Sequence, residues 1–182
     1  NTITMTVNPN VAASVSIAAS PSTTICSGTN VTFTATPTNG GTTPAYQWKK
    51  NGVNVGTNST TYSENALTNG NTITCTMTSN AACVTGSPAV SNTLTMTVNS
   101  TPTVTGFSPG NGTVGTSVVI TGTNFSAVTQ VQFNITNASF TINNSTQITA
   151  TVPAGATTGT IKVTNACGTG TSVSSFTVNS TP

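Results

Sequence analysis

The sequence predicts an all-β protein built from two tandem β-sandwiches joined end to end, and three observations carry this prediction. Apolar residues alternate with Thr, Ser or Asn along most of the chain, which is the pattern of strands with one buried and one solvated face. Turn signals containing Gly, Asn or Pro recur at short intervals, as they do in β-sandwiches. One strand-like octapeptide also occurs twice, at residues 1–8 and 92–99, and residues 97–102 return at 177–182.

The repeated octapeptide sets the expected domain boundaries. Its two copies differ only in Ile3, which stands where the second copy has Leu94. The second copy ends a predicted sandwich, so we expect residues 1–8 to be the last strand of a preceding unit or a strand donated to a neighbouring chain. The remaining chain divides into one domain at 9–99 and another at 100–182. We therefore expect a window of a longer tandem array.

The near absence of charge excludes most catalytic chemistry. Of 182 residues only Lys49, Lys50, Lys162 and Glu64 are charged, and the chain contains no His and no Asp. Paired carboxylates, a Ser-His-Asp triad and a carboxylate calcium site all need residues that this composition lacks. We expect no enzyme activity and no cofactor, with Glu64 in a surface loop and the two adjacent lysines at a solvated strand end.

The charge pattern also argues against two kinds of partner. A nucleic-acid-binding surface needs several clustered Lys or Arg residues to contact phosphates, and this chain has three lysines in all. No apolar run approaches the roughly 20 residues of a membrane-spanning helix. We expect neither nucleic-acid binding nor membrane insertion.

The first domain shows an ordered series of strand patterns separated by turns. The segments 25–30, 38–44 and 79–91 are predicted turns or loops, because they are rich in Gly, Pro, Asn and Ser. The predicted strands cover 11–19, 31–37, 46–50, 53–55, 60–62, 72–78 and 92–99. Period-2 alternation places Val31, Phe33, Ala35, Ile73, Cys75 and Met77 toward the core.

These cues resemble an immunoglobulin-like domain. Gly28-x-x-Val-Thr-Phe-Thr-Ala35 is followed by Trp48 and then by a strand that contains Cys75, which matches that family's order of a second strand, a core tryptophan and a later cysteine. The resemblance implies that Trp48 is a core residue, together with Phe33 and Ile73. Ala35 stands where the family has its first cysteine, so the family's disulfide between sheets is absent.

The second domain resembles a different branch of the same fold. Predicted strands lie at 103–110, 115–125, 131–133, 146–153 and 159–164, and residues 115–125 contain the pattern Gly-x-x-Val-x-Ile-x-Gly-x-Asn-Phe. The whole segment 100–182 looks like an IPT/TIG domain, with Phe125 and Phe133 as expected core residues. The DNA-binding role of some relatives does not carry over, because the basic residues are missing.

Residues 1–99 also resemble repeats of secreted surface proteins of Bacteroidetes-type bacteria, which carry PKD or immunoglobulin-like units. The similarity lies in the Ile-Cys-x-Gly-Thr segment, the Tyr-Gln-Trp core and the Met-Thr-Val-Asn ending. It implies an extracellular or cell-surface location, with export by the type IX system, and a role in adhesins or filaments.

The four cysteines leave several pairings open. Cys26, Cys75 and Cys83 lie in the first domain and Cys167 in the second, and the absence of Cys-x-x-Cys and His argues against zinc. A sandwich of this size is about 26 Å tall, and Cys26 and Cys83 are expected at opposite ends of it, so a disulfide between them would need a loop that folds far over the side. We favour an interdomain Cys26–Cys167 bridge, with Cys83 bonded to a preceding unit and Cys75 a buried thiol. A Cys26–Cys83 bridge and free or intermolecular thiols remain alternatives.

The surface residues offer candidate modification sites. Asn-x-Ser/Thr triplets are acceptors for N-glycans in secreted proteins. The candidates are Asn30, Asn58, Asn124 and Asn134.

The leading functional hypothesis is a non-enzymatic structural segment of a long extracellular adhesin or surface filament. Its partners would be neighbouring units of the same array and other copies in a fibre. One alternative is a glycan- or protein-binding accessory module. The other is a fibre subunit that exchanges strands through residues 1–8.

Overall fold

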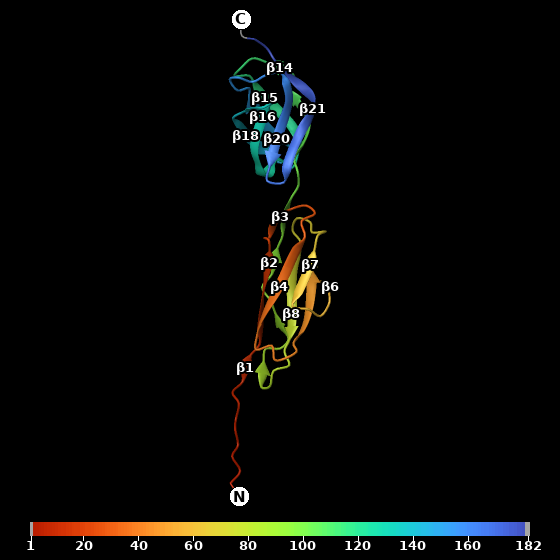
Figure 1. Ribbon diagram of the computed structural model, residues 1–182, viewed down its shortest axis with the longest axis vertical. Coiled ribbons are helices and arrows are strands. Elements are labelled where there is room, and N and C mark those ends of the chain that lie inside the picture. The colour runs from red at the N-terminus through yellow and green to blue at the C-terminus, as the bar shows by residue number, and fades with distance from the viewer. Residues whose placement is uncertain (1, 181–182) are drawn as a thin grey trace. The chain divides into compact units, whose positions relative to one another are not determined.

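The computed structural model describes residues 2–180 and divides the chain into two compact units, Asn1–Val98 and Asn99–Pro182. Every element in the described residues is a strand except one short 3-10 helix, so the predicted all-β class is confirmed (Figure 1). Each unit buries its own hydrophobic cluster.

The first unit contains twelve strands. They are β1 (Val11–Ala12), β2 (Ser14–Ser20), β3 (Thr24–Cys26), β4 (Val31–Thr38), β5 (Ala45–Lys50), β6 (Val53–Val55), β7 (Thr61–Glu64), β8 (Thr72–Thr78), β9 (Val84–Thr85), β10 (Ala89–Val90), β11 (Leu94–Thr95) and β12 (Thr97–Asn99).

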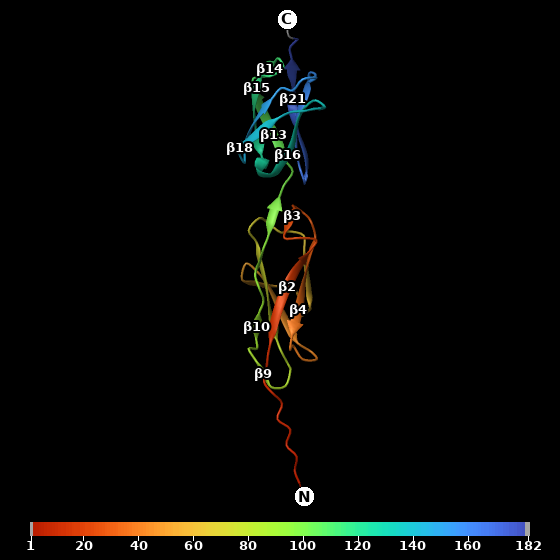
Figure 2. The ribbon, with the colours of Figure 1, turned by 90° about the vertical axis from the view of Figure 1, so that its left-hand side faces the viewer.

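The strands of this unit form two facing sheets with short accessory pairs at their ends. One sheet has the order β2-β4-β7, and the other has the order β10-β8-β5-β6 with β11 also paired to β8. Strands β2 and β4 of the first sheet lie side by side in Figure 2. The side chains of Phe33, Trp48 and Tyr62 meet between the sheets, with ring centroids 5.9–6.4 Å apart. The indole N–H of Trp48 donates to the Ser59 carbonyl at 2.9 Å, which satisfies the one polar atom of a fully buried side chain.

The second unit contains nine strands and the 3-10 helix. They are β13 (Thr103–Ser108), β14 (Asn111–Gly112), β15 (Ser117–Thr123), η1 (Phe125–Ala127), β16 (Val128–Phe133), β17 (Thr136–Asn137), β18 (Phe140–Asn144), β19 (Gln147–Thr151), β20 (Gly159–Asn165) and β21 (Gly168–Val178).

These strands also build two sheets around one core. The sheet orders are β13-β15-β19-β18 and β14-β21-β20-β16-β17. Phe133 and Phe176 make an edge-to-face contact at 5.0 Å in the core, and Phe107 lies 6.1 Å from Phe176. Gly122 is required for the close approach of β13 and η1, because a Cβ there would overlap the Thr103 carbonyl and the Phe125 ring.

Several local features differ from the sequence prediction, and the short strands β3, β9 and β10 lie in segments predicted as turns or loops. Residues 2–8 form no strand, because no other described segment pairs with them, and Asn1 lies outside the described residues. The strand predicted at 92–99 is interrupted at Met96 and switches partner, since β11 pairs with β8 and β12 with β3. Strands β18 and β21 were not predicted at all, because exposed Ser, Thr and Asn dominate their patterns.

Candidate functional site

The first candidate is a charged cluster that joins the two sheets of the first unit. Lys50 at the end of β5 forms an ion pair with Glu64 at the end of β7, with 2.8 Å between Nζ and Oε2. The same Oε2 accepts a hydrogen bond from the Tyr62 hydroxyl at 2.9 Å, and Oε1 accepts one from the Ala66 N–H. Glu64 therefore ends a strand and is mostly buried, which corrects the prediction of a surface loop.

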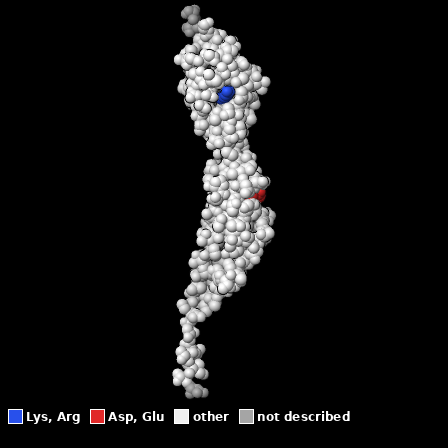
Figure 3. Space-filling model, in the orientation of Figure 1, with Lys and Arg blue, Asp and Glu red and all other residues white. Residues whose placement is uncertain are grey.

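This cluster holds its carboxylate in the charged state. The hydrogen bond from Lys50 is the largest influence, and with the Ala66 N–H it lowers the pKa of Glu64 to about 2. Burial, followed by the hydrogen bond to Glu64, raises the pKa of Tyr62 to about 12. Neither group has a pKa near neutrality, so the cluster is suited to bridging sheets rather than to proton transfer. The face drawn in Figure 3 shows one small acidic patch and one small basic patch, and its other described residues are uncharged.

The second candidate is a pocket in the second unit. It has a volume of about 320 Å³ and lies between β13, the edge strand of one sheet, and β21 of the other sheet. Its lining comprises Thr105, Gly106, Phe107, Gly110 and the run 172–175. The lining combines hydroxyl groups with one aromatic ring, which is a surface suited to a neutral polar ligand.

Irregularities in both strands shape this pocket. The pairing of β13 with β15 shifts between Val104 and Gly106, and the pairing of β20 with β21 shifts between Thr160 and Lys162. The buried Ser172 side chain stabilises the second shift, because its Oγ accepts from the Ile161 N–H at 2.9 Å and donates to the Ser174 carbonyl at 2.7 Å. The bulge leaves Val173 98% exposed at the rim.

The cysteines fall into two classes. Cys26 and Cys167 are disulfide-bonded, whereas Cys75 and Cys83 are free thiols. Cys75 is fully buried on β8, and burial raises its pKa to about 11, so it behaves as a small apolar core residue. The alternative Cys26–Cys83 bridge is wrong, because Cys83 carries a free thiol.

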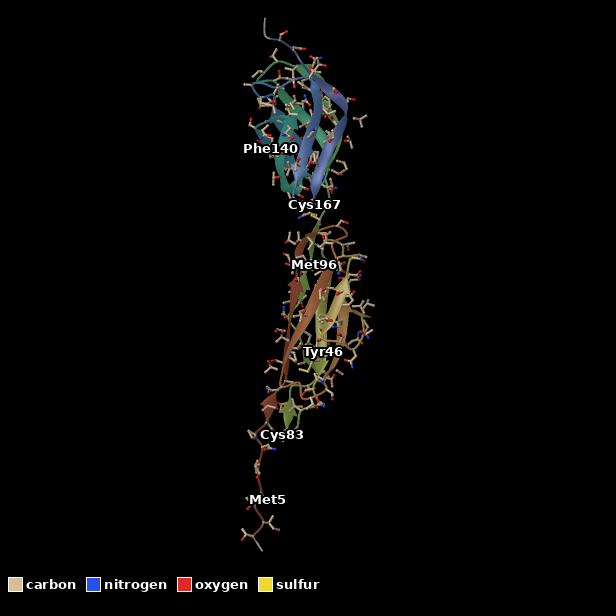
Figure 4. All side chains as sticks on the ribbon, viewed as in Figure 1. Met5, Tyr46, Cys83, Met96, Phe140 and Cys167 are labelled. Atoms are coloured by element: carbon tan, nitrogen blue, oxygen red, sulfur yellow. The ribbon has the colours of Figure 1, made fainter. Side chains whose placement is uncertain are left out.

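Cys83 lies in the hairpin loop that follows β8. It is exposed, adopts a left-handed turn conformation with φ of 55°, and its carbonyl accepts the Val11 N–H at 3.0 Å. The first residue of β1 is thereby fixed beside this cysteine, and β1 continues in parallel pairing with β9. The thiol is placed where residues 2–10 join the body of the unit (Figure 4).

The residues predicted to form the cores are all buried. Trp48, Phe33 and Ile73 belong to the cluster of the first unit, and Phe125 and Phe133 to that of the second. All five are at most 1% exposed. They serve packing and are not available to a ligand.

The four candidate glycosylation sites differ in the state of the amide nitrogen that would carry the sugar. Asn124 and Asn134 adopt left-handed conformations, and their Nδ2 groups donate to the Thr101 carbonyl and to Thr157 Oγ1. A glycan there would break a hydrogen bond. Asn30 and Asn58 are exposed, and Oδ1 of Asn58 accepts a hydrogen bond from the Tyr46 N–H at 2.7 Å.

The N-terminal octapeptide presents an unpartnered apolar pattern. Ile3, Met5 and Val7 are each 85–86% exposed, although they alternate with threonine as in a half-buried strand. Met5 lies away from both sheets in Figure 4, whereas its counterpart Met96 lies inside the unit and is 1% exposed. Sequence alternation identified this segment, but only the structure shows that it is unpaired.

Residues 2–180 contain no cluster of three His, Cys, Asp or Glu side chains that could hold a metal ion. Within the same range, no helix is long and apolar enough to cross a bilayer. The charged cluster bridges the two sheets of the first unit, the cysteines provide disulfides and free thiols, and the second unit offers a small pocket with an uncharged lining.

Comparison with known families gives one match. Residues 102–180 match the family described as the IPT/TIG domain, which confirms the resemblance predicted for the second domain. No curated protein matches the chain. The assignment of residues 9–99 to a PKD or immunoglobulin-like repeat family stays a prediction.

Several solved structures are similar to parts of this chain. A candidate phosphatase from Bacteroides thetaiotaomicron is 28% identical over 43% of this chain and 18% of its own, with a TM-score of 0.40. An auxiliary nutrient binding protein from Bacteroides ovatus is 25% identical over 43% and 21%, with a TM-score of 0.40. SGBP-B from a complex xyloglucan utilization locus in Bacteroides uniformis is 17% identical over 88% and 48%, with a TM-score of 0.44. The chain spans less than half of each.

Proposed function

We propose that this chain, whose residues 102–180 match the IPT/TIG domain, is a non-enzymatic structural segment of an extracellular tandem array, such as an adhesin or surface filament. The observation that carries the proposal is the state of its cysteines. Disulfides persist in oxidising compartments, and Cys26 and Cys167 belong to different units and are each disulfide-bonded. The role is to hold consecutive β-sandwiches at a defined joint.

The joint itself would be stiffened by a Cys26–Cys167 bond. Strand β3 ends at Cys26 and pairs with β12, the last strand of the first unit. In the second unit the Cys167 carbonyl accepts a hydrogen bond from Thr101 Oγ1 at 3.0 Å, so this cysteine lies beside the incoming chain. Only residues 100–102 separate β12 from β13, a span of about 15 Å at most. Cys26 thus ends the strand that pairs with β12, just before the linker, and Cys167 is hydrogen-bonded to Thr101 within the linker.

The test is non-reducing peptide mapping combined with small-angle X-ray scattering. A peptide pair joining Cys26 to Cys167 is expected from monomeric protein, and Cys167→Ser is expected to broaden the interatomic distance distribution. Val173→Ser, on the exposed rim of the second unit, is the matched control and leaves the distribution unchanged. A cross-linked dimer, or equal distributions for the cysteine variant and the wild type, refutes the joint.

The second candidate function is a glycan- or protein-binding accessory module. The pocket beside Phe107 favours it, because hydroxyl groups and an aromatic ring are groups that contact neutral sugars. A glycan array is expected to give a hit. Val173→Arg, at the rim of the pocket, is expected to abolish that hit while thermal unfolding stays unchanged. Binding that survives this substitution places the ligand elsewhere.

A further inference from the structure

We propose that residues 2–8 are the closing strand of an immunoglobulin-like unit that precedes Val11 in the same polypeptide, and that Cys83 forms a disulfide with a cysteine of that unit. This inference rests on the proposed role in a tandem array and names the partner. The partner is a β-sandwich whose edge lacks its last strand. It carries a cysteine at the position that Cys26 occupies in the first unit.

The exposed octapeptide has the side chains of a strand that is buried elsewhere in the same chain. Residues 2–8 repeat residues 93–99 with the single change of Leu94 to Ile3. In the second copy Met96 is 1% exposed, and Leu94 and Val98 pack against the core of the first unit. In the first copy the equivalent side chains lie in solvent. An alternating apolar strand with open backbone groups needs a sheet edge as its partner.

The structure of residues 92–98 shows what that edge must provide. Leu94 and Thr95 pair with Ile73 and Thr72 of β8, and the Met96 N–H donates to the Asn71 carbonyl at 2.8 Å. The following N–H groups are bound by other segments. Thr97 N–H donates to the Thr23 carbonyl at 2.8 Å, and Val98 N–H donates to Asn69 Oδ1 at 3.1 Å. A unit of the same design would bind residues 2–7 in the same register.

The short connection to the first unit then brings that partner close to Cys83. Only Pro9 and Asn10 lie between the octapeptide and Val11, so the closing strand ends within about 11 Å of Val11. The Val11 N–H is bound to the Cys83 carbonyl. In the first unit, β12 is the end of the closing strand. It pairs with β3, and β3 carries Cys26. The equivalent cysteine of a preceding unit would therefore lie near Cys83.

The second unit provides a precedent for this arrangement. Its hairpin Asn165-Ala-Cys-Gly-Thr-Gly170 resembles Asn80-Ala-Ala-Cys-Val-Thr-Gly86 in the first unit. Each hairpin follows a long core strand, and each cysteine carbonyl accepts a hydrogen bond from the incoming chain at 3.0 Å, from Thr101 in one unit and Val11 in the other. Cys167 is disulfide-bonded and Cys83 is free and exposed. Cys83 thus occupies the position that corresponds to Cys167, and the preceding unit would supply the cysteine that pairs with it.

Bond formation requires an oxidant, which we assign to the class of small-molecule disulfides such as oxidised glutathione. The Cys83 thiolate attacks one sulfur of that disulfide and releases one reduced thiol. The thiolate of the partner cysteine then attacks the mixed disulfide at Cys83 and releases the second thiol. Two protein thiols are oxidised and one disulfide is reduced, so the two electrons and two protons are balanced.

The test uses the complete chain with residues 9–91 repeated directly before residue 1. In this extended chain, residues 1–8 stand where the added copy needs its closing strand, and the cysteine at position 83 of the added copy is replaced by serine. Hydrogen exchange and peptide mapping in a glutathione redox buffer are compared with the original chain. We expect the amides of residues 3–7 to exchange at least about 100-fold more slowly in the extended chain. We also expect a Cys26–Cys83 peptide pair that the original chain does not give.

Matched substitutions separate the strand from general stability. Met5→Asn in the extended chain should abolish the protection of backbone amides from hydrogen exchange in the added copy alone. Met96→Asn should abolish it in the original first unit alone. Equal exchange of residues 3–7 in both chains overturns the inference, and so does an added copy that folds without them. Protection that appears in the original chain and rises with concentration assigns the strand to a second copy instead and also overturns it. The Cys26–Cys167 peptide of the original chain tests the array role separately.

Discussion

Glu64 is the only Asp or Glu side chain in the protein, so the acid stability of the first unit depends on one side chain. We expect Glu64→Gln to destabilise this unit at pH 7, because it removes the charge from the contacts with Lys50 and Tyr62 while keeping the shape of the side chain. The pKa of Glu64 falls from 4.5 to about 2 on folding, which corresponds to about 3 kcal/mol. The Lys50 and Glu64 side chains remain 26% and 18% exposed, so screening by water reduces this to about 1–2 kcal/mol.

The sign of the pH dependence follows from the lowered pKa. A carboxylate that binds protons less readily in the folded state contributes stability above its unfolded pKa, and that contribution disappears as pH falls from about 4.5 to about 2. Wild-type protein should lose about 1–2 kcal/mol across this window. Glu64→Gln should show a flat profile and a melting temperature about 5–15 °C lower at pH 7.

Thermal unfolding followed by circular dichroism at pH 7, 5, 4, 3 and 2 measures both effects. Lys49→Gln is the matched control, because it removes the neighbouring lysine charge and leaves the ion pair intact. A wild-type profile that stays flat down to pH 2 contradicts the reasoning, and so does a Glu64→Gln variant that keeps the acid slope.

Four further outcomes are expected. Under non-reducing conditions a maleimide should label Cys83 within minutes and Cys75 only after unfolding, because one thiol is exposed and the other buried; equal rates in native protein would contradict the burial. Ala35→Cys should cross-link to Cys75, since both positions lie in the core between facing sheets, and two free thiols in denatured protein would show that the geometry fails. Ser172→Ala should cost the second unit about 1–3 kcal/mol in denaturant unfolding by leaving the Ile161 N–H without its acceptor, whereas an unchanged midpoint would mean that water replaces the hydroxyl. Ultraviolet titration of native protein should find Tyr62 ionising near pH 12. Because the folded-state pKa is raised, the stability that Tyr62 adds should be lost as pH rises from about 10 to 12. A transition of Tyr62 near pH 10 would contradict this.

Local patterns were sufficient for most of the fold. Strands such as β4 and β8 have strict alternation of large apolar residues with threonine, so their inward faces could be read directly, and the residues that alternation placed inward are buried. Strand β21 was not predicted because its eleven residues include eight Ser, Thr or Gly and few large apolar side chains. Its pairing with β20 arises from neighbours in the sheet, which a local pattern does not contain.

The candidate sites depended more heavily on tertiary structure. The sequence shows that the chain has one carboxylate. It does not show that Glu64 lies at a strand end beside Lys50, because these residues belong to different sheets. The pocket beside Phe107 was not predicted, because it arises from register shifts in two separate strands. Sequence equally could not decide which cysteines are free, because that depends on distances between distant segments.

The sequence by itself determined the all-β class, the repeated closing strand and the near absence of charged side chains, because alternation, self-similarity and composition do not depend on how distant segments meet in space. Tertiary structure decided that Met96 is buried and Met5 exposed although their flanking residues are the same. The physical reason is that a strand buries its apolar face only where another sheet edge offers hydrogen bonds and a core. The second copy has that edge in β8 and β3, and the described residues offer none to the first.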